Sequence, residues 1–375
     1  MNFGFTEEQD VLRAEVRKFL DENAPLDEVR KISESAAGHS PEQWRRIAEL
    51  GWTGLIVPEC HGGAGLGAVD LVVLLEETGR TLYPSPLLST TTAAAALLAA
   101  GSDAQRARWL PALAEGAEIG TLAFLEAADR LDAAGVELAG EREADAYVLR
   151  GEKCFVPDAG AATLFIVPFR TGPAPEDLAL AVVPRGAEGV AAEDFPGMDL
   201  TKRIGRLTLD GVRVPADAIL GRPGRVWPAL ARTLDFATAA VTAEAIGAAE
   251  GALALTTEYA RNRIQFGSPI GRYQAVKHPL AEMYVDIESW KSLCYYAAWA
   301  LDESPDEAPR YVSMAKAYAS EAFARIGIDV IQLHGAVGYT WEFDAHLYLK
   351  RSKWVRPMYG DADYHYDRVA ALGGL

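Results

Sequence analysis

The chain has 375 residues, half of them hydrophobic, and a formal net charge of −17. This composition predicts a folded protein with a sizeable core, long enough for two or three structural units. The acidic excess argues against a nucleic-acid partner, because affinity for phosphate backbones depends on clustered Lys and Arg, although a few local cations are enough to hold a phosphorylated cofactor.

Helices are predicted throughout the first third of the chain. Thr6 and Gln9 form a capping-box pattern, and apolar residues follow at helical spacing. Later helices are predicted over 41–50, from the glycine-rich turn 62–67 to about Thr81, and over 90–100 and 104–114. The glycine-rich turn does not have GxGxxG spacing and no Gly-Lys-Ser/Thr follows it, so a plain turn before a helix is favoured over a phosphate loop.

The pattern changes between about Gly120 and Gly221. Short apolar runs separated by turn residues predict β-strands in this region. The runs are 146–149, 164–167 and 178–183. Asp210-Gly211 stands between two further short runs and predicts a tight hairpin, because this dipeptide readily adopts positive φ.

Helical periodicity returns after Gly221 and continues to the end. The span 229–263 has no proline and carries small residues on more than one face, which favours close helix contacts. Two more helices are predicted over 274 to about 302 and over 309–333, with Gly335 placed to end the second. We expect an antiparallel bundle here and domain boundaries that divide the chain into 1–118, 119–222 and 223–375.

Several classes of protein are disfavoured by what the sequence lacks. Cys60, Cys154 and Cys294 are widely spaced and form neither a disulfide framework nor a paired metal pattern. The histidines show no HExxH or paired spacing, so we expect no metal site. The N-terminus does not resemble a signal peptide and no run is apolar enough to span a bilayer, so we expect a cytoplasmic protein without membrane association.

One segment, Arg263-Ile-Gln-Phe-Gly-Ser-Pro-Ile270, suggests recognition of a phosphorylated ligand. A guanidinium at the end of a long helix can bind a pyrophosphate bidentately. Phe266 beside Gly267 offers an aromatic face on which an adenine can stack. Taken alone, the segment fits a helix C-terminus with a surface arginine equally well.

Three segments together resemble the signatures of the acyl-CoA dehydrogenase family. Residues 259–270, with Gln274 and Lys277, are similar to its RxQFGxPI motif with the Gln and Lys beyond it, and 331–340 is similar to its second signature. Residues 54–66 resemble its N-terminal pattern. The similarity spans the full chain and is closest to the base-lacking partner subunits of actinobacterial heteromeric acyl-CoA dehydrogenases.

This resemblance implies a mainly α, multidomain α+β fold with an N-terminal helical domain, a middle β-domain and a C-terminal four-helix bundle. It also implies an FAD cofactor, an acyl-CoA substrate, and a homo-oligomer or a heterotetramer with a second acyl-CoA dehydrogenase chain. In the family the flavin lies between subunits. The residues that the resemblance places at its pyrophosphate and adenine end are Arg263, Gln265, Phe266, Gln274, Gln332, His334 and Gly335, and Phe155 falls beside the flavin ring.

The chain departs from the family pattern at the catalytic base. In the family a carboxylate abstracts the α-proton of the thioester while the β-hydrogen passes as hydride to the flavin. The usual Glu position aligns with Tyr359 and the alternative position aligns with Ala237. The flavin-contacting loop, which corresponds to 125–132, has also lost its usual residues. The base and the flavin-ring contacts are therefore expected to be missing, while the adenine-end motifs are intact.

Nearby carboxylates leave an alternative open. Asp361 lies two residues past the usual position and is a fallback base, and Asp235 lies two residues before the alternative position and is a candidate substrate contact. The plain interpretations are a solvated turn residue for Asp361 and a helix N-terminal charge for Asp235. A self-sufficient enzyme, a flavoenzyme of the same fold with oxidase or biosynthetic chemistry, and a flavin-free scaffold remain rivals of the partner-dependent subunit.

Overall fold

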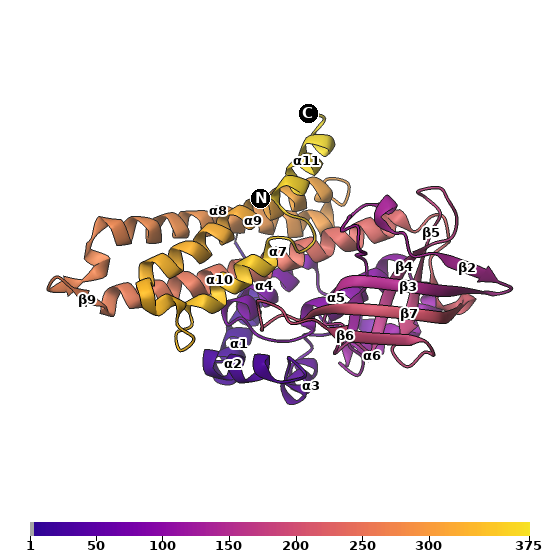
Figure 1. The fold of residues 1–375 in the computed structure, drawn as a ribbon, viewed down its shortest axis with the longest axis horizontal. Coiled ribbons are helices and arrows are strands. Elements are labelled where there is room, and N and C mark those ends of the chain that lie inside the picture. The colour runs from indigo at the N-terminus through magenta and orange to yellow at the C-terminus, as the bar shows by residue number, and fades with distance from the viewer. Residues whose placement is uncertain (1–3) are drawn as a thin grey trace. The chain divides into compact units, whose positions relative to one another are not determined.

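The computed structural model describes residues 4–375 and divides them into two compact units. The first unit contains residues 4–31, 68–83 and 238–375, and the second contains 32–67 and 84–237. Along the chain, helices come first, strands occupy the middle and helices return at the end (Figure 1). The predicted mainly α, α+β fold is confirmed.

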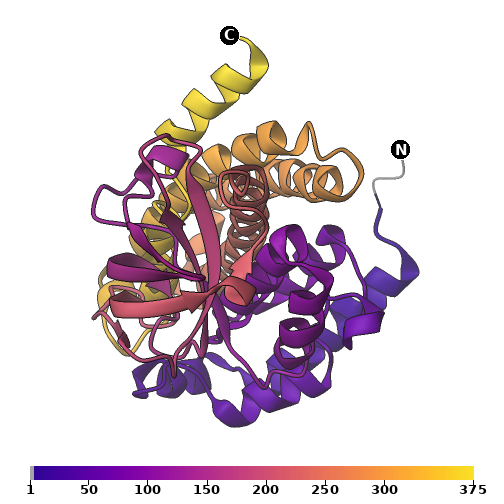
Figure 2. The ribbon, with the colours of Figure 1, turned by 90° about the vertical axis from the view of Figure 1, so that its right-hand side faces the viewer.

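A bundle of four helices forms the body of the first unit. These are α7 (Trp227–Asn262, from residue 238 onward), α8 (Gln274–Glu303), α9 (Ala308–His334) and α10 (Ala345–Val355). Ala239 of α7 packs with Ala297 of α8 and Val312 of α9. Figure 2 shows several of these helices nearly end-on. A side chain at Gly251 of α7 would collide with Tyr348 of α10. Small residues therefore let the helices approach closely, and the predicted bundle is confirmed.

Helices α1 (Glu7–Asn23), α4 (Ala68–Arg80) and α11 (Ala362–Gly373) complete the helical part of this unit. The predicted capping box is present, since the Gln9 backbone N–H donates to Thr6 Oγ1 and the Thr6 N–H donates to Gln9 Oε1. At Gly79 of α4, an added Cβ would lie 1.8 Å from the carbonyl oxygen of Glu244 in α7. Only glycine permits this close approach of two helix backbones.

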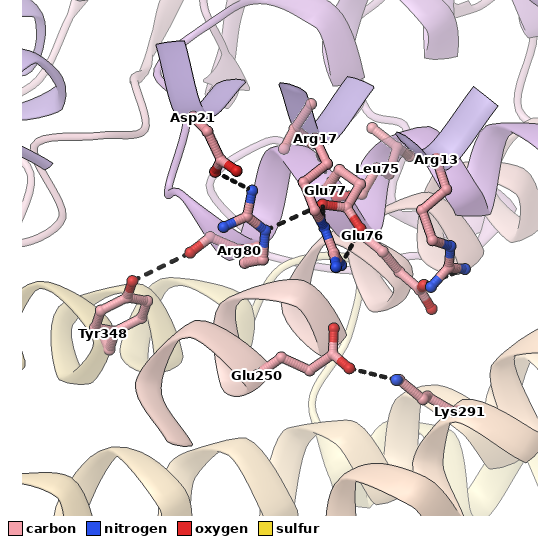
Figure 3. A network of polar contacts seen from close by, with 11 residues as sticks. Arg13, Arg17, Asp21, Leu75, Glu76, Glu77, Arg80, Glu250, Lys291 and Tyr348 are labelled. Atoms are coloured by element: carbon pink, nitrogen blue, oxygen red, sulfur yellow. Dashed lines mark hydrogen bonds and ion pairs between the residues drawn. The ribbon is translucent and has the colours of Figure 1, made fainter. Parts of the chain in front are cut away.

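Arginines of α1 pair with two buried carboxylates of α4 and hold the helices together (Figure 3). Arg17 donates to both carboxylate oxygens of Glu77, at 2.9 and 2.7 Å, and Arg13 lies 2.9 Å from Glu76. Glu76 is only 1% exposed. Its burial outweighs the attraction of Arg13 and raises the pKa of Glu76 to about 7. This contact is therefore sensitive to pH in the neutral range.

Two four-stranded sheets dominate the second unit, in the orders β1-β4-β5-β8 and β2-β3-β7-β6. The strands are β1 (Gly120–Leu122), β2 (Gly140–Glu143), β3 (Ala146–Pro157), β4 (Leu164–Arg170), β5 (Leu178–Pro184), β6 (Val190–Asp194), β7 (Ile204–Pro215) and β8 (Ile219–Leu220). Leu149, Phe165 and Leu207 belong to the core that both sheets share. The helices of this unit include α3 (Pro41–Glu49), α5 (Leu87–Ala100) and α6 (Asp103–Ala114), close to their predicted bounds.

The hairpin predicted at Asp210-Gly211 is wrong. Strand β7 runs straight through this dipeptide and pairs with β3 on both sides of it, Val212 opposite Leu149 and Asp210 opposite Arg150. Gly211, with φ of 70°, is the extra residue of a β-bulge. A bulge uses the positive φ that a primed turn also needs, so the local signal was the same for both.

Helix α2 (Leu26–Glu34) is an addition to the predicted elements. It spans nine residues and directly follows Pro25. Within residues 4–375, no helix combines the length and the apolar character needed to cross a bilayer.

Candidate functional site

The segment after α7 forms a small exposed hairpin, β9 (Ile264–Gln265) and β10 (Ser268–Pro269), at one end of the bundle helices (Figure 1). Phe266 and Gly267 form its turn with φ of 51° and 75°. Positive φ at both central residues is the geometry of a primed hairpin turn. Phe266 is 92% exposed, so a strained backbone presents a bare aromatic ring to whatever binds here.

Contacts within the hairpin orient it without covering it. Tyr273 donates its hydroxyl to Gln265 O at 3.2 Å, and its ring meets that of Phe266 edge-on at 6.3 Å. Arg263, Gln265 and Gln274 are all exposed. Among the described residues, no acidic partner of the Arg263 guanidinium is found. An anionic ligand would therefore meet a free bidentate donor beside an aromatic face.

Gln332, His334 and Gly335, the second group of predicted cofactor contacts, lie at the end of α9 in different environments. Gln332 and Gly335 are exposed, and Gly335 ends the helix as predicted, with φ of 65°. His334 instead is buried, and its Nδ1 donates to Val330 O at 2.7 Å. Burial lowers the pKa of His334, so the ring is neutral and packs 4.4 Å from Tyr259. It supports the helix end from inside, and its predicted contact with a cofactor stays a prediction.

Tyr359, which the resemblance predicts to occupy the usual base position, lies in a tight turn between α10 and α11. Tyr359 has φ of 55° and is 7% exposed. Asp361, the fallback base, is exposed, and its Oδ1 accepts the Tyr364 N–H at 3.0 Å as the N-cap of α11. Capping satisfies a backbone donor that the helix leaves free. The structure therefore gives Asp361 a structural task in this chain.

Two buried side chains that the motifs did not indicate hold this turn. Lys316 of α9 donates to the carbonyl oxygens of Arg356 and Gly360, and His365 contacts that of Tyr359 at 3.0 Å. Burial lowers the pKa of Lys316 to about 7 and that of His365 to about 3. A lysine within the small-residue stripe of a predicted core helix was the signal that could have indicated Lys316.

In the second unit, Phe155 lies at an irregularity of strand β3. Its φ is 51°, and the β3–β7 register shifts between Lys153 and Val156. The bulge turns the ring outward, leaving Phe155 45% exposed. Bulges often re-aim a side chain in this way beside functional sites. Phe155 is therefore free to contact a ligand ring, as the prediction requires.

The loop over 125–132 keeps a buried anchor although its sequence has diverged. Glu126 accepts hydrogen bonds from the backbone N–H groups of Glu137 and Leu138, and Lys153 binds it at 2.5 Å. Burial lowers the pKa of Lys153 to about 8, against the attraction of Glu126. This pair ties the loop to β3 two residues before Phe155.

Ala237 and Asp235 both lie inside α7 and are buried. Asp235 is far from the first turn of the helix, so the interpretation as a helix N-terminal charge is wrong. Ala237, predicted to align with the alternative base position, offers only a methyl group. A substrate contact through Asp235 stays a prediction.

Three family models match the chain in succession. They describe the acyl-CoA dehydrogenase N-terminal domain over residues 6–117, the middle domain over 121–212 and the C-terminal domain over 225–372. With the helical, β and helical segments in this order, the chain belongs to the acyl-CoA dehydrogenase family, a family of FAD-dependent oxidoreductases. The boundaries predicted at 118/119 and 222/223 stay predictions.

The similar proteins include a curated acyl-CoA dehydrogenase and two solved structures that are named as pairs of chains. The chain is 33% identical over 350 residues to the acyl-CoA dehydrogenase IpdE2 of Mycolicibacterium smegmatis, covering 92% of this chain and 93% of that protein. It is similar to a variant of the Tcur3481–Tcur3483 steroid acyl-CoA dehydrogenase, with 31% identity, TM-score 0.88 and 98% coverage of both chains. The ChsE4–ChsE5 complex from Mycobacterium tuberculosis matches with 28% identity, TM-score 0.90 and coverage of 100% and 99%. The predicted likeness to heteromeric actinobacterial enzymes is confirmed.

Proposed function

We propose that this chain is an FAD-binding subunit of an acyl-CoA dehydrogenase that introduces an α,β double bond into an acyl-CoA thioester, with the base supplied by a second, paralogous chain. The observation that carries the proposal is a contrast within one chain. Arg263 and Phe266 are exposed and can contact a cofactor, whereas the two base positions hold Tyr359 and Ala237, which are not carboxylates. Two similar solved structures named as pairs of chains support a heteromeric assembly.

The described residues fit FAD at its adenine end. The free Arg263 guanidinium suits the pyrophosphate, and the Phe266 ring suits adenine stacking. Gln265 and Gln274 add exposed amide donors and acceptors on the same hairpin and helix start. When bound, FAD accepts the β-hydrogen as hydride. Phe155 offers a flat apolar face to the ring system, and it supplies no hydroxyl donor.

Neither predicted base position, Tyr359 or Ala237, carries a group that can take the α-proton. This proton is weakly acidic, so fast desaturation needs a positioned base in a site that excludes water. Neither a methyl group nor a protonated phenol accepts a proton, and Asp361 is engaged as a helix cap. A partner chain with a carboxylate at the corresponding position would supply what is missing.

Flavin content and flavin reduction test this proposal. The chain is purified alone and after co-expression with neighbouring acyl-CoA dehydrogenase genes, and flavin per chain is measured by absorbance. We expect a thioester to bleach the flavin slowly or not at all with the chain alone and rapidly with the complex. Rapid bleaching of stoichiometric flavin by the chain alone would rule out the partner-dependent subunit.

The same preparations separate the two rival functions. Oxygen-dependent turnover with release of peroxide indicates a flavoenzyme of this fold with oxidase chemistry. A protein that stays colourless after incubation with FAD, alone and in the complex, indicates a scaffold that has lost the flavin.

A further inference from the structure

The turn over residues 358–361 carries backbone strain at a buried side chain. Tyr359 has φ of 55°, and Gly360 follows with φ of 102°. Large residues rarely adopt this left-handed region, and they stay in it only where the surrounding structure holds them. Tyr359 is only 7% exposed, so protein surrounds it on nearly all sides. Contacts with the neighbouring helices must therefore hold the turn against this strain.

Lys316 supplies one restraint. Its side chain is completely buried, and its Nζ donates to Gly360 O at 2.7 Å, to Arg356 O at 3.0 Å and to Ser320 Oγ at 2.8 Å. These acceptors match the three N–H donors of an ammonium group. Burying a lysine is unfavourable unless such partners compensate. The lysine and the two turn carbonyls therefore stabilise each other.

His365 of α11 restrains the preceding carbonyl. Its Nε2 lies 3.0 Å from Tyr359 O, and because a carbonyl oxygen only accepts, Nε2 carries the proton. An added Cβ at Gly360 would lie 2.4 Å from the Tyr364 ring and 3.0 Å from this nitrogen. The consecutive carbonyls of Tyr359 and Gly360 are thus held from two different helices.

We propose that Lys316 and His365 are positioning residues that hold the 358–361 turn. They keep the side chain at position 359 in one fixed direction, both for the present tyrosine and for a base introduced there. This inference rests on the proposed function, in which position 359 is a base position. It implies that a carboxylate introduced there can remove the α-proton of a bound thioester. The C–H bond breaks, the proton passes to the carboxylate oxygen, and the electron pair stays on the α-carbon in conjugation with the thioester carbonyl.

The first experiment looks for a gain of proton transfer. The flavin-loaded protein carrying Tyr359→Glu is incubated in D2O with butyryl-, octanoyl- and palmitoyl-CoA, and mass spectrometry measures deuterium at the α-carbon. We expect exchange at least about tenfold faster than in the unmodified protein with one or more of these thioesters. Tyr359→Gln, a neutral side chain of the same length as the introduced one, should give no gain. A folded, flavin-bound Tyr359→Glu protein without faster exchange contradicts the inference.

The second experiment removes the restraints from the gain-of-function variant. Lys316→Met or His365→Leu is combined with Tyr359→Glu. We expect kcat for exchange to fall about tenfold to hundredfold with KM nearly unchanged, because a displaced base impairs proton transfer rather than CoA binding. His365→Gln retains an N–H donor and should keep most of the rate. Equal kcat in all these variants would show that the two side chains do not position the base.

A third measurement needs no catalysis. Hydrogen exchange of the amides over 360–365 is followed in the folded Lys316→Met protein, with Lys291→Met on the neighbouring helix α8 as the control. We expect faster exchange only in the first variant. Unchanged protection in Lys316→Met rejects the positioning role. A protein that binds no flavin, alone and in the complex, would instead refute the proposed function, and this measurement would still decide the role of Lys316.

Discussion

The exposed hairpin and the base-position turn place an aromatic residue in the same strained backbone conformation but in opposite surroundings. Phe266 has φ of 51° and is 92% exposed, whereas Tyr359 has φ of 55° and is 7% exposed. At the hairpin, the strain presents a ring outward. At the turn, buried Lys316 and His365 hold the backbone. Backbone strain alone therefore does not distinguish a binding surface from an internally supported turn. The burial of the strained residue makes that distinction.

Replacing each aromatic residue by glycine should separate the two regions most strongly. Glycine relieves the strain in both, but Tyr359→Gly also empties a buried site, and we expect a net loss of about 2–4 kcal/mol in the free energy of unfolding. Phe266→Gly should leave stability within about 0.5 kcal/mol or raise it slightly. Thermal and urea unfolding of both variants measure the contrast. Similar losses in both would break the comparison.

Glu76 is a second buried site, away from both regions, and it pairs with Arg13 between two helices. Its pKa of about 7 lies above the ordinary value of 4.5, so the folded state holds a proton that the unfolded state releases. The stability due to Glu76 is therefore full below about pH 4.5 and declines until about pH 7. Unfolding across pH 4–8 should show a decline of up to about 3 kcal/mol relative to Glu76→Gln, whose amide does not titrate. A constant difference between the two proteins would exclude the raised pKa.

Arg263→Ala should act on the cofactor and not on the fold. Removing a bidentate, charge-assisted contact is expected to weaken FAD binding by about 1.5–3 kcal/mol, or roughly tenfold to a hundredfold. Arg261→Ala, at an exposed position of the same helix end, is the matched control. Titration of the flavin-free proteins with FAD measures both. Equal affinity in the two variants would remove the hairpin from the cofactor site.

The smallest effect is expected at Asp361, where the cap and the fallback base can be told apart. Loss of the cap in Asp361→Ala should cost about 1 kcal/mol of stability. Asp361→Asn retains a capping oxygen and should recover most of it, and neither change should alter the rate of flavin reduction in the complex. If both variants abolish reduction while remaining folded, Asp361 is the base after all.

Local sequence patterns predicted most of the elements, because helical periodicity and capping residues act over a few neighbouring positions. Thr6 with Gln9 and Gly335 marked helix ends correctly. Asp210-Gly211 did not predict its structure correctly, since positive φ serves a turn or a bulge equally. The chain does not reverse at Gly211, because β3 pairs with β7 on both sides of this residue.

The candidate site divides along the same line. Motifs were enough to predict cofactor contacts at Arg263 and Phe266 and the lack of a base at Tyr359, because residue identity at an aligned position is a property of the sequence itself. These roles stay predictions. The supports were not predicted from sequence. Lys316 donates to Gly360 O and His365 donates to Tyr359 O. No sequence pattern predicts which carbonyl oxygen a buried side chain will contact.

The sequence by itself therefore determined the family and the order of helical and β segments, and it predicted the loss of both base carboxylates. The tertiary structure decided that His334 points inward, that Asp361 caps a helix, and that His365 holds the turn at Tyr359. Burial and hydrogen-bond partners depend on chain segments far apart in sequence, and only folding brings those segments together.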